Sequence, residues 1–254
     1  MLNKHQIGYT IYIIILLLQA KLGVSQRYEK DKNPPIGGVV IRALFPSSAF
    51  ETAPSSINKN GNIISVVGTG GFSWGGLVRK NVSQNGLFYL ESGLNYTRRN
   101  YENRYSDSTG EINVTVPLRV DNYELPVIGG VMVKFNQNYY LSSGLGFSFD
   151  FFPQSLRKNG DSLSIISNRR NWVIAGLEAR IGLEYRTNGK GIIYLGAAYH
   201  RMATNVANNR YQYTRVDGQK VETGLPLQAH YFSIDLRYFF TNYRTEPVNY
   251  NSLP

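Results

Sequence analysis

The sequence predicts an all-β protein: an eight-stranded antiparallel up-and-down transmembrane β-barrel with an N-terminal signal peptide. Three observations predict this fold. Apolar and polar side chains alternate along the candidate strands, long and short connections alternate between them, and aromatic residues gather near the strand ends. Together these features are typical of barrels that cross a membrane with strands.

Composition restricts the class of protein. The chain has 254 residues, 25 glycines, 13% aromatic residues and no cysteine. This length fits one barrel domain, and the lack of cysteine excludes disulfides and thiolate metal sites. The formal net charge of +10 is of a size that often indicates nucleic-acid binding. However, the basic residues are spread along the strands of a chain expected to be secreted. We therefore expect no nucleic-acid partner.

The N-terminus has the pattern of a cleaved signal peptide. A basic start at Lys4 precedes the apolar run 11–18, and small residues at 23–25 predict cleavage before Gln26. The apolar run is shorter than the ~20 residues of a spanning helix, which disfavours a membrane anchor. The expected divisions are a signal peptide at 1–25, a periplasmic lead at 26–35, the barrel at 36–240 and a periplasmic tail at 241–254.

Turn-forming residues separate the candidate strands. The expected strands are 36–45, 66–80, 86–101, 123–135, 138–152, 171–185, 191–205 and 231–240. The second, fourth and sixth connections are tight. The first, third, fifth and seventh, at 46–65, 102–122, 153–170 and 206–230, are long and polar. This alternation predicts short periplasmic turns, long external loops and two periplasmic termini.

Side-chain alternation is clear in the last strand, where Phe232 and Ile234 oppose Asp235 and Arg237. A soluble lipocalin-like barrel would turn the apolar face inward around a ligand, whereas a membrane barrel turns it outward. Glycine and serine share the face of the charges, as a narrow, filled interior requires, which favours the membrane barrel. The expected aromatic girdles are Phe88, Phe135, Tyr139, Tyr185, Tyr238 and Phe240 toward the turns, and Tyr96, Phe149, Phe151, Trp172 and Tyr199 toward the loops.

Five segments carry a resemblance to a known group of proteins. They are GFSWGGLVR at 71–79, LESGLNY at 90–96, ELPV at 124–127, YLSSGLG at 140–146 and FSIDLRYFF at 232–240. With these segments, the chain resembles the small outer-membrane β-barrels of the OmpA/OmpX and PorT-like type, especially those of Bacteroidota. The resemblance implies an outer-membrane location and specifies architecture, not activity. Unlike many members of that group, this chain continues past the closing Phe240 into a tail.

Charged residues on the predicted inner face form a candidate lumen network. Isolated charges in a narrow interior are costly, so we expect them to form ion pairs. A gated ion path is the alternative, but the filled interior of an eight-stranded barrel favours a structural role. The residues are Arg42, Arg79, Glu91, Arg99, Asp150, Glu178, Arg180, Glu184, Asp235 and Arg237.

A lipid-modifying enzyme is a further alternative. His200 and His230, with Ser233 and Asp150, offer the groups of a nucleophile, a base and an orienting acid. Their spacing is not diagnostic, and no spacing of His, Asp or Glu indicates a metal site. We therefore expect no catalytic residues, no metal and no cofactor.

Four arginines are expected where strands meet the long loops: Arg98, Arg169, Arg170 and Arg201. A guanidinium there can pair with lipid A phosphates, although rim solubility explains the same residues. The expected partners are therefore outer-membrane lipid and lipopolysaccharide, with other envelope proteins bound through the loops or the 241–254 tail. The expected function is a structural or accessory module of the envelope. A small channel or porin, a lipid-A-modifying enzyme and a surface adhesin are the alternatives.

Overall fold

The computed structural model describes residues 34–47, 55–59, 61–83, 86–106, 113–153, 156–159, 163–187, 190–214 and 220–240. The expected signal peptide, nearly all of the periplasmic lead and the C-terminal tail lie outside these residues. No helix in the described part of the chain is long and apolar enough to span a membrane.

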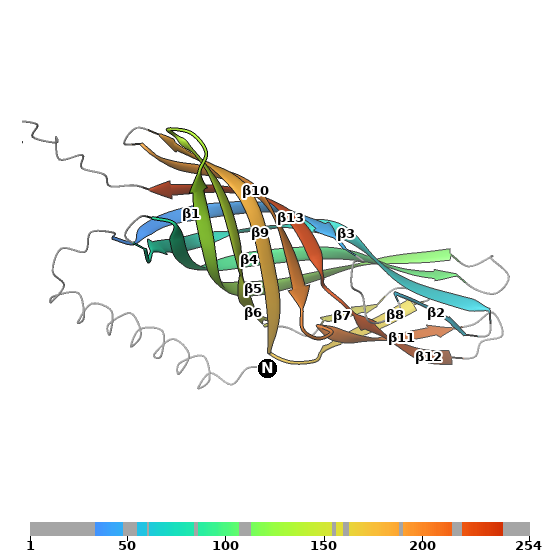
Figure 1. The fold of residues 1–254 in the computed structure, drawn as a ribbon. Coiled ribbons are helices and arrows are strands. Elements are labelled where there is room, and N and C mark those ends of the chain that lie inside the picture. Colours follow the sequence, from blue (N-terminus) through green and yellow to red (C-terminus); the bar gives the residue numbers. More distant parts are fainter. Residues whose placement is uncertain are drawn as a thin grey trace, which may run out of the picture. The chain divides into compact units, whose positions relative to one another are not determined.

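The larger sheet contains nine antiparallel strands (Figure 1). They are β1 (Ile36–Pro46), β2 (Ser56–Lys59), β3 (Asn62–Asn81), β4 (Phe88–Ser106), β5 (Asn113–Lys134), β6 (Tyr139–Phe151), β9 (Val173–Thr187), β10 (Gly191–Met202) and β13 (Tyr231–Phe240). Ile41 of β1 lies opposite Leu236 of β13 on one side and Trp74 of β3 on the other. All of these strands except β2 therefore pair in a closed order, and we call them the ring. The prediction of an all-β antiparallel chain is confirmed.

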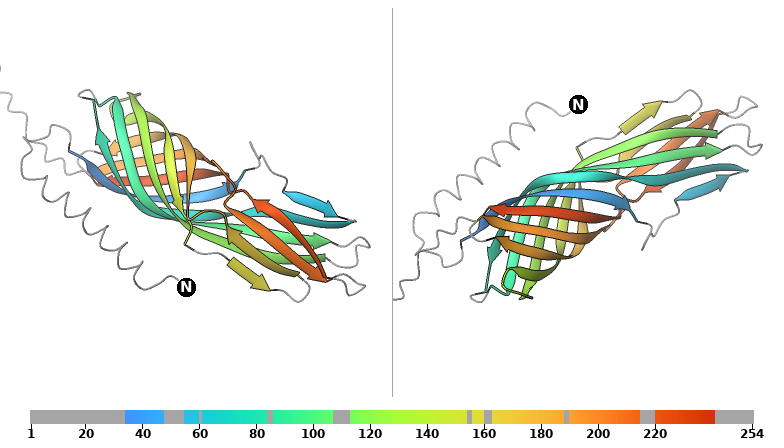
Figure 2. Two further views of the ribbon diagram at one scale, coloured as in Figure 1. Left: turned by 90° about the horizontal axis from the view of Figure 1, so that it is seen from below. Right: turned by 90° about the horizontal axis from the view of Figure 1, so that it is seen from above.

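A second sheet of four antiparallel strands occupies two of the segments expected as loops. Its strands are β7 (Leu156–Asn159), β8 (Leu163–Arg169), β11 (Ala207–Thr214) and β12 (Lys220–Leu227). In the segment expected as a loop at 102–122, β4 and β5 continue as paired strands as far as Ser106 and Asn113. Figure 2 shows these extended strands continuing beyond the ring beside the second sheet.

The extended ends of the ring strands and the second sheet enclose an apolar core, and we call this unit the sandwich. Tyr105 and Val116 of the larger sheet pack with Ile165, Tyr211 and Leu225 of the second sheet. The prediction of long polar loops is therefore wrong for most of these residues. The reason is that inward apolar side chains alternate with outward polar ones in these strands. The average polarity of such a segment therefore does not indicate that one of its faces is buried.

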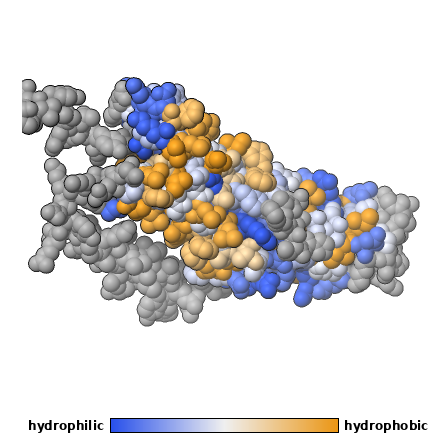
Figure 3. All heavy atoms as spheres, viewed as in Figure 1, coloured by the Kyte–Doolittle hydropathy of each residue, from blue (hydrophilic) through white to orange (hydrophobic). Residues whose placement is uncertain are grey.

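The ring has an apolar outside and a polar inside. In β13, Phe232, Ile234 and Leu236 are about half exposed, whereas Asp235 and Arg237 are buried. A folded chain rarely exposes so continuous an apolar surface to water. In Figure 3 the hydrophobic side chains gather over the ring, whereas the end with the second sheet is mainly hydrophilic. We call the exposed apolar side chains of the ring the belt.

Aromatic contacts lie at both ends of the belt. Toward the sandwich, Tyr96 contacts Trp74 and Tyr123, with ring centroids 6.2 and 5.9 Å apart. Toward the tight turns, the rings of Tyr139 and Tyr185 lie 5.0 Å apart. Such pairs at two levels have the distribution of interfacial aromatic residues.

Candidate functional site

The interior of the ring holds all ten residues of the predicted lumen network. Strand alternation turns each of them inward, and the solvent-exposed fraction of every one is 5% or less. They are connected by ion pairs, several of which cross the interior between non-neighbouring strands. The ten are Arg42, Arg79, Glu91, Arg99, Asp150, Glu178, Arg180, Glu184, Asp235 and Arg237.

Glu91 is the centre of the half of the network nearer the turns. Its carboxylate accepts hydrogen bonds from Arg79 at 2.9 Å, Arg180 at 2.7 Å and Arg237 at 2.8 Å. Arg79 also pairs with Glu184. Three guanidiniums from three strands thus share one buried carboxylate, which offsets the cost of removing them from water.

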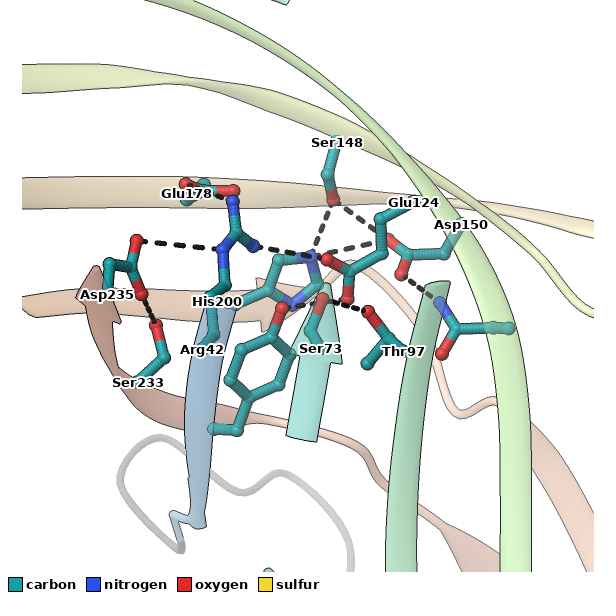
Figure 4. Close-up of polar contacts among 12 residues, drawn as sticks. Arg42, Ser73, Thr97, Glu124, Ser148, Asp150, Glu178, His200, Ser233 and Asp235 are labelled. Carbon is teal, nitrogen blue, oxygen red and sulfur yellow. Dashed lines mark hydrogen bonds and ion pairs between the residues drawn. The ribbon is translucent and has the colours of Figure 1, made fainter. Parts of the chain in front are cut away.

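Arg42 is the centre of the other half (Figure 4). Its guanidinium lies 3.3 Å from Glu124, 3.7 Å from Glu178 and 3.6 Å from Asp235. Asp235 also pairs with Arg237 at 2.5 Å, so the two halves form one connected network. Such connections hold strands in fixed relative positions.

His200 completes this half of the network. Its Nε2 lies 2.6 Å from the Ser148 hydroxyl and 3.3 Å from the Asp150 carboxylate (Figure 4). Asp150 accepts further hydrogen bonds from Asn122 and from Ser148. Tyr231 stacks on the imidazole, with ring centroids 4.7 Å apart.

Glu124 and His200 are network members that the candidate residue set did not include. Glu124 accepts hydrogen bonds from Arg99 at 2.9 Å and from Tyr231 at 2.7 Å. Its signal in the sequence is the alternation of exposed Tyr123 with buried Glu124 along β5. No spacing could show that Glu124, Asp150 and His200 meet, because they come from three strands.

The geometry does not provide the considered catalytic set. A relay needs the acid on one imidazole nitrogen and the hydroxyl on the other. Here Asp150 and the nearest hydroxyl, that of Ser148, both approach Nε2 of His200. Ser233 instead donates to Asp235, and all of these groups are buried.

Two buried apolar clusters contact the region of the charge network. Toward the sandwich, the next inward residue after Arg99 is Tyr101, after Asp150 it is Phe152, and after His200 it is Met202, all in one buried cluster. A second cluster lies among the charges of the turn half, where Val40 and Tyr194 both lie opposite Arg237. It consists of Val40, Leu77, Ile192, Tyr194 and Phe239. Among the described residues, apolar side chains therefore share the interior with the charges.

A small cavity lies in the wall where β1 ends beside β3. It has a volume of about 20 Å³, room for about one water molecule, and Pro46, Gly68, Arg99, His230 and Tyr231 are among its lining residues. The pairing of β3 with β4 is irregular beside Gly68, where an added Cβ would lie 2.6 Å from Cβ of Pro46. Absence of a side chain there keeps the cavity open.

His230 lies at this cavity, in the segment that precedes β13. Burial and the nearby Arg201 lower the pKa of its imidazole, which favours the neutral form. Its Nδ1 accepts a hydrogen bond from the Met202 amide at 3.1 Å, so the ring proton belongs on Nε2.

The four arginines expected where strands meet the long loops lie on different elements, and their contacts differ. Arg98, about one third exposed, pairs with Asp121 at 3.3 Å and lies over the ring of Phe72 at the sandwich end of the belt. Arg169 donates to the carbonyl oxygens of Phe152 and Pro153. Arg169 thus has a structural role that the sequence did not show.

Arg170 and Arg201, the other two arginines of this set, differ in their exposure. Arg170 is exposed and follows β8, whereas Arg201 is partly buried on β10. Of the four, Arg98 is the one whose described contacts place it at the end of the belt.

No family model and no curated protein matches this chain. Among solved structures, the chain is similar to the outer membrane protein OprG from Pseudomonas aeruginosa. The identity is 12% and the TM-score 0.48 over 81% of this chain and 95% of that one. It is also similar to the translocator domain of autotransporter NalP from Neisseria meningitidis, at 13% identity and a TM-score of 0.36. That match covers 93% of this chain and 98% of that one. These similarities assign the chain to no family.

Proposed function

We propose that the chain is an integral outer-membrane protein in which the ring is a closed, eight-stranded transmembrane barrel. The observation that carries this proposal is the inverted distribution of polarity, with the belt outside and the charge network inside. Lipid is the environment in which that distribution is favourable. A cleaved signal at 1–25 would deliver the chain to the periplasm.

The barrel is proposed to serve as a rigid anchor that holds the sandwich at the cell surface, as a structural or accessory module of the envelope. Two features favour this role over that of a channel. Ion pairs join strands across the interior of the ring, and the segments opposite the tight turns have a core of their own. A surface adhesin is the second candidate, because the sandwich is the part this orientation would present to other cells.

Planar-bilayer recording separates the anchor from the channel. We expect purified, folded protein to insert without discrete conductance steps, because ion pairs and apolar side chains fill the interior. Heat-modifiable migration of the same sample on gels, and its recovery with outer membranes, supply the control for folding and location. Reproducible single-channel steps from folded protein would reject the closed anchor, and recovery in the soluble periplasm would reject the membrane location.

Lipopolysaccharide is the proposed lipid partner, with its phosphates bound near Arg98 at the sandwich end of the belt. A guanidinium at this level can reach the headgroup layer while Phe72 remains among acyl chains. We expect Arg98→Gln to retain less lipopolysaccharide during purification than the wild type or Arg210→Gln, a control on the sandwich. Equal retention by Arg98→Gln and the wild type would exclude this contact.

A further inference from the structure

We infer that Glu124, Asp150 and His200 form a binding site for a divalent metal ion of the Zn²⁺ type. The three come from β5, β6 and β10, and strand alternation turns each side chain into the ring. Each offers a ligand atom within 4.8 Å of the others, and none is more than 1% exposed. The inference does not depend on the proposed function, because it concerns the interior alone.

The distance between two of the groups already suits a metal. Zn²⁺ binds nitrogen and oxygen ligands at about 2.0–2.1 Å, so tetrahedral ligands lie about 3.3 Å apart. Asp150 Oδ2 and His200 Nε2 lie 3.3 Å apart. The Ser148 hydroxyl, at 2.6 Å from the nitrogen and 2.8 Å from the carboxylate oxygen, is positioned as a fourth ligand.

Glu124 is held in place for the third position. Arg99 and Tyr231 both donate to its Oε1, while Oε2 has a longer contact of 3.3 Å with Arg42. Rotation of the carboxylate can therefore bring Oε2 to a metal while Oε1 keeps its two donors. Donors of this kind commonly orient metal-binding carboxylates.

Two further observations concern the buried groups around the site. Nδ1 of the buried His200 has no hydrogen-bond partner among the described residues, whereas Nε2 faces Asp150 and Ser148. The described chain also buries more carboxylates than guanidiniums. The carboxylates are Glu91, Glu124, Asp150, Glu178, Glu184 and Asp235, and the guanidiniums are Arg42, Arg79, Arg99, Arg180 and Arg237. Excess buried negative charge is costly, and a bound cation offsets it.

A metal would replace a proton at His200. The Ser148 hydroxyl has one hydrogen but lies within hydrogen-bond distance of both Asp150 and His200. If it donates to Asp150, Nε2 of His200 must donate to it. Metal binding through Nε2 then displaces that proton. A neutral imidazole keeps the proton by moving it to Nδ1, whereas an imidazolium, which already has a proton on Nδ1, releases it to solvent. The wall cavity is lined by Arg99 and Tyr231, the two residues that donate to Oε1 of Glu124.

The test uses the tag-free full-length protein, stripped with a chelator and refolded in detergent with Zn²⁺ present. Metal that survives desalting is then counted per chain by mass spectrometry. We expect about one ion in the wild type and in His230→Gln, whose histidine lies outside the cluster. Asp150→Asn and His200→Gln should each lose at least nine tenths of it. Fewer than about 0.2 ions per wild-type chain would mean that the site takes a proton only and would overturn the inference.

Co²⁺ loading of the wild type tests the ligands without relying on variants. We expect the intense visible absorption of a four-coordinate site, removed by added Zn²⁺. The weak spectrum of a six-coordinate, water-rich ion would instead indicate surface binding and would reject the site. Equal Zn²⁺ retention in folded His200→Gln would have the same consequence.

Discussion

At the scale of single residues, the ion pairs inside the ring depend on which carboxylates each guanidinium can reach. Glu91 alone accepts hydrogen bonds from Arg79, Arg180 and Arg237, which come from three strands. Removing one partner from such a group leaves several others buried without compensation. Replacing a central residue should therefore lower the free energy of unfolding far more than removing an exposed ion pair.

Replacing Glu91 with glutamine tests this directly. The change keeps the shape but removes the charge that three guanidiniums share, so we expect the free energy of unfolding to fall by about 3–5 kcal/mol. Urea titration in detergent, followed by heat-modifiable migration, measures the change. Glu222→Gln is the matched control. Its pair with Arg210 is about half exposed, and its loss should be below about 1 kcal/mol. Similar effects for the two variants would contradict the central role of Glu91.

The sequence predicted much of the candidate site at this scale, for a physical reason. Period-two alternation fixes which side of a strand each residue faces, so all ten predicted charges lie inside the ring. Their partners could not be predicted, because pairs such as Arg237 and Glu91 join strands far apart in the chain. Register and strand tilt determine those contacts, and neither can be read from one segment.

At the scale of elements, the strands of the ring were predicted from alternation and turns, whereas β2, β7, β8, β11 and β12 were not. The missed strands are shorter and polar on average, and the core beneath them combines single residues from both sheets. Tyr211 shows the difficulty. It is fully buried, and its hydroxyl donates to Asn103 of the opposite sheet at 2.6 Å.

The close approach of β3 and β4 at Gly75 predicts that a larger side chain there lowers the stability of the sheet. A Cβ added at Gly75 would lie 2.2 Å from the carbonyl oxygen of Leu94, so Gly75→Ala must push the two strands apart. We expect a loss of about 1–3 kcal/mol in unfolding free energy. Gly76→Ala, on the outer face of the same strand, should change stability little, since the atom nearest to its added Cβ, the Gly38 carbonyl oxygen, lies 4.0 Å away. Equal urea midpoints for the two variants would argue against this packing.

At the scale of the whole molecule, the chain combines two kinds of core. The ring turns apolar side chains outward and buries charge, whereas the sandwich buries apolar side chains between two sheets. A membrane around the ring and water around the sandwich satisfy both arrangements at once. The boundary between the apolar outer surface of the ring and the polar outer surface of the sandwich lies near Arg98 and Tyr96. We therefore expect the lipid headgroups at this level.

The orientation of the whole molecule follows from this division and can be tested on cells. If the ring spans the outer membrane with its tight turns in the periplasm, the β11–β12 connection (215–219) faces the medium and the β9–β10 turn (188–189) does not. We expect an epitope inserted at 215–219 to bind antibody on intact cells. The same epitope at 188–189 should bind only after the outer membrane is permeabilised. Flow cytometry measures both, with heat-modifiable migration as the folding control. Labelling of 188–189 on intact cells, with 215–219 silent, would reverse the orientation and place the sandwich in the periplasm.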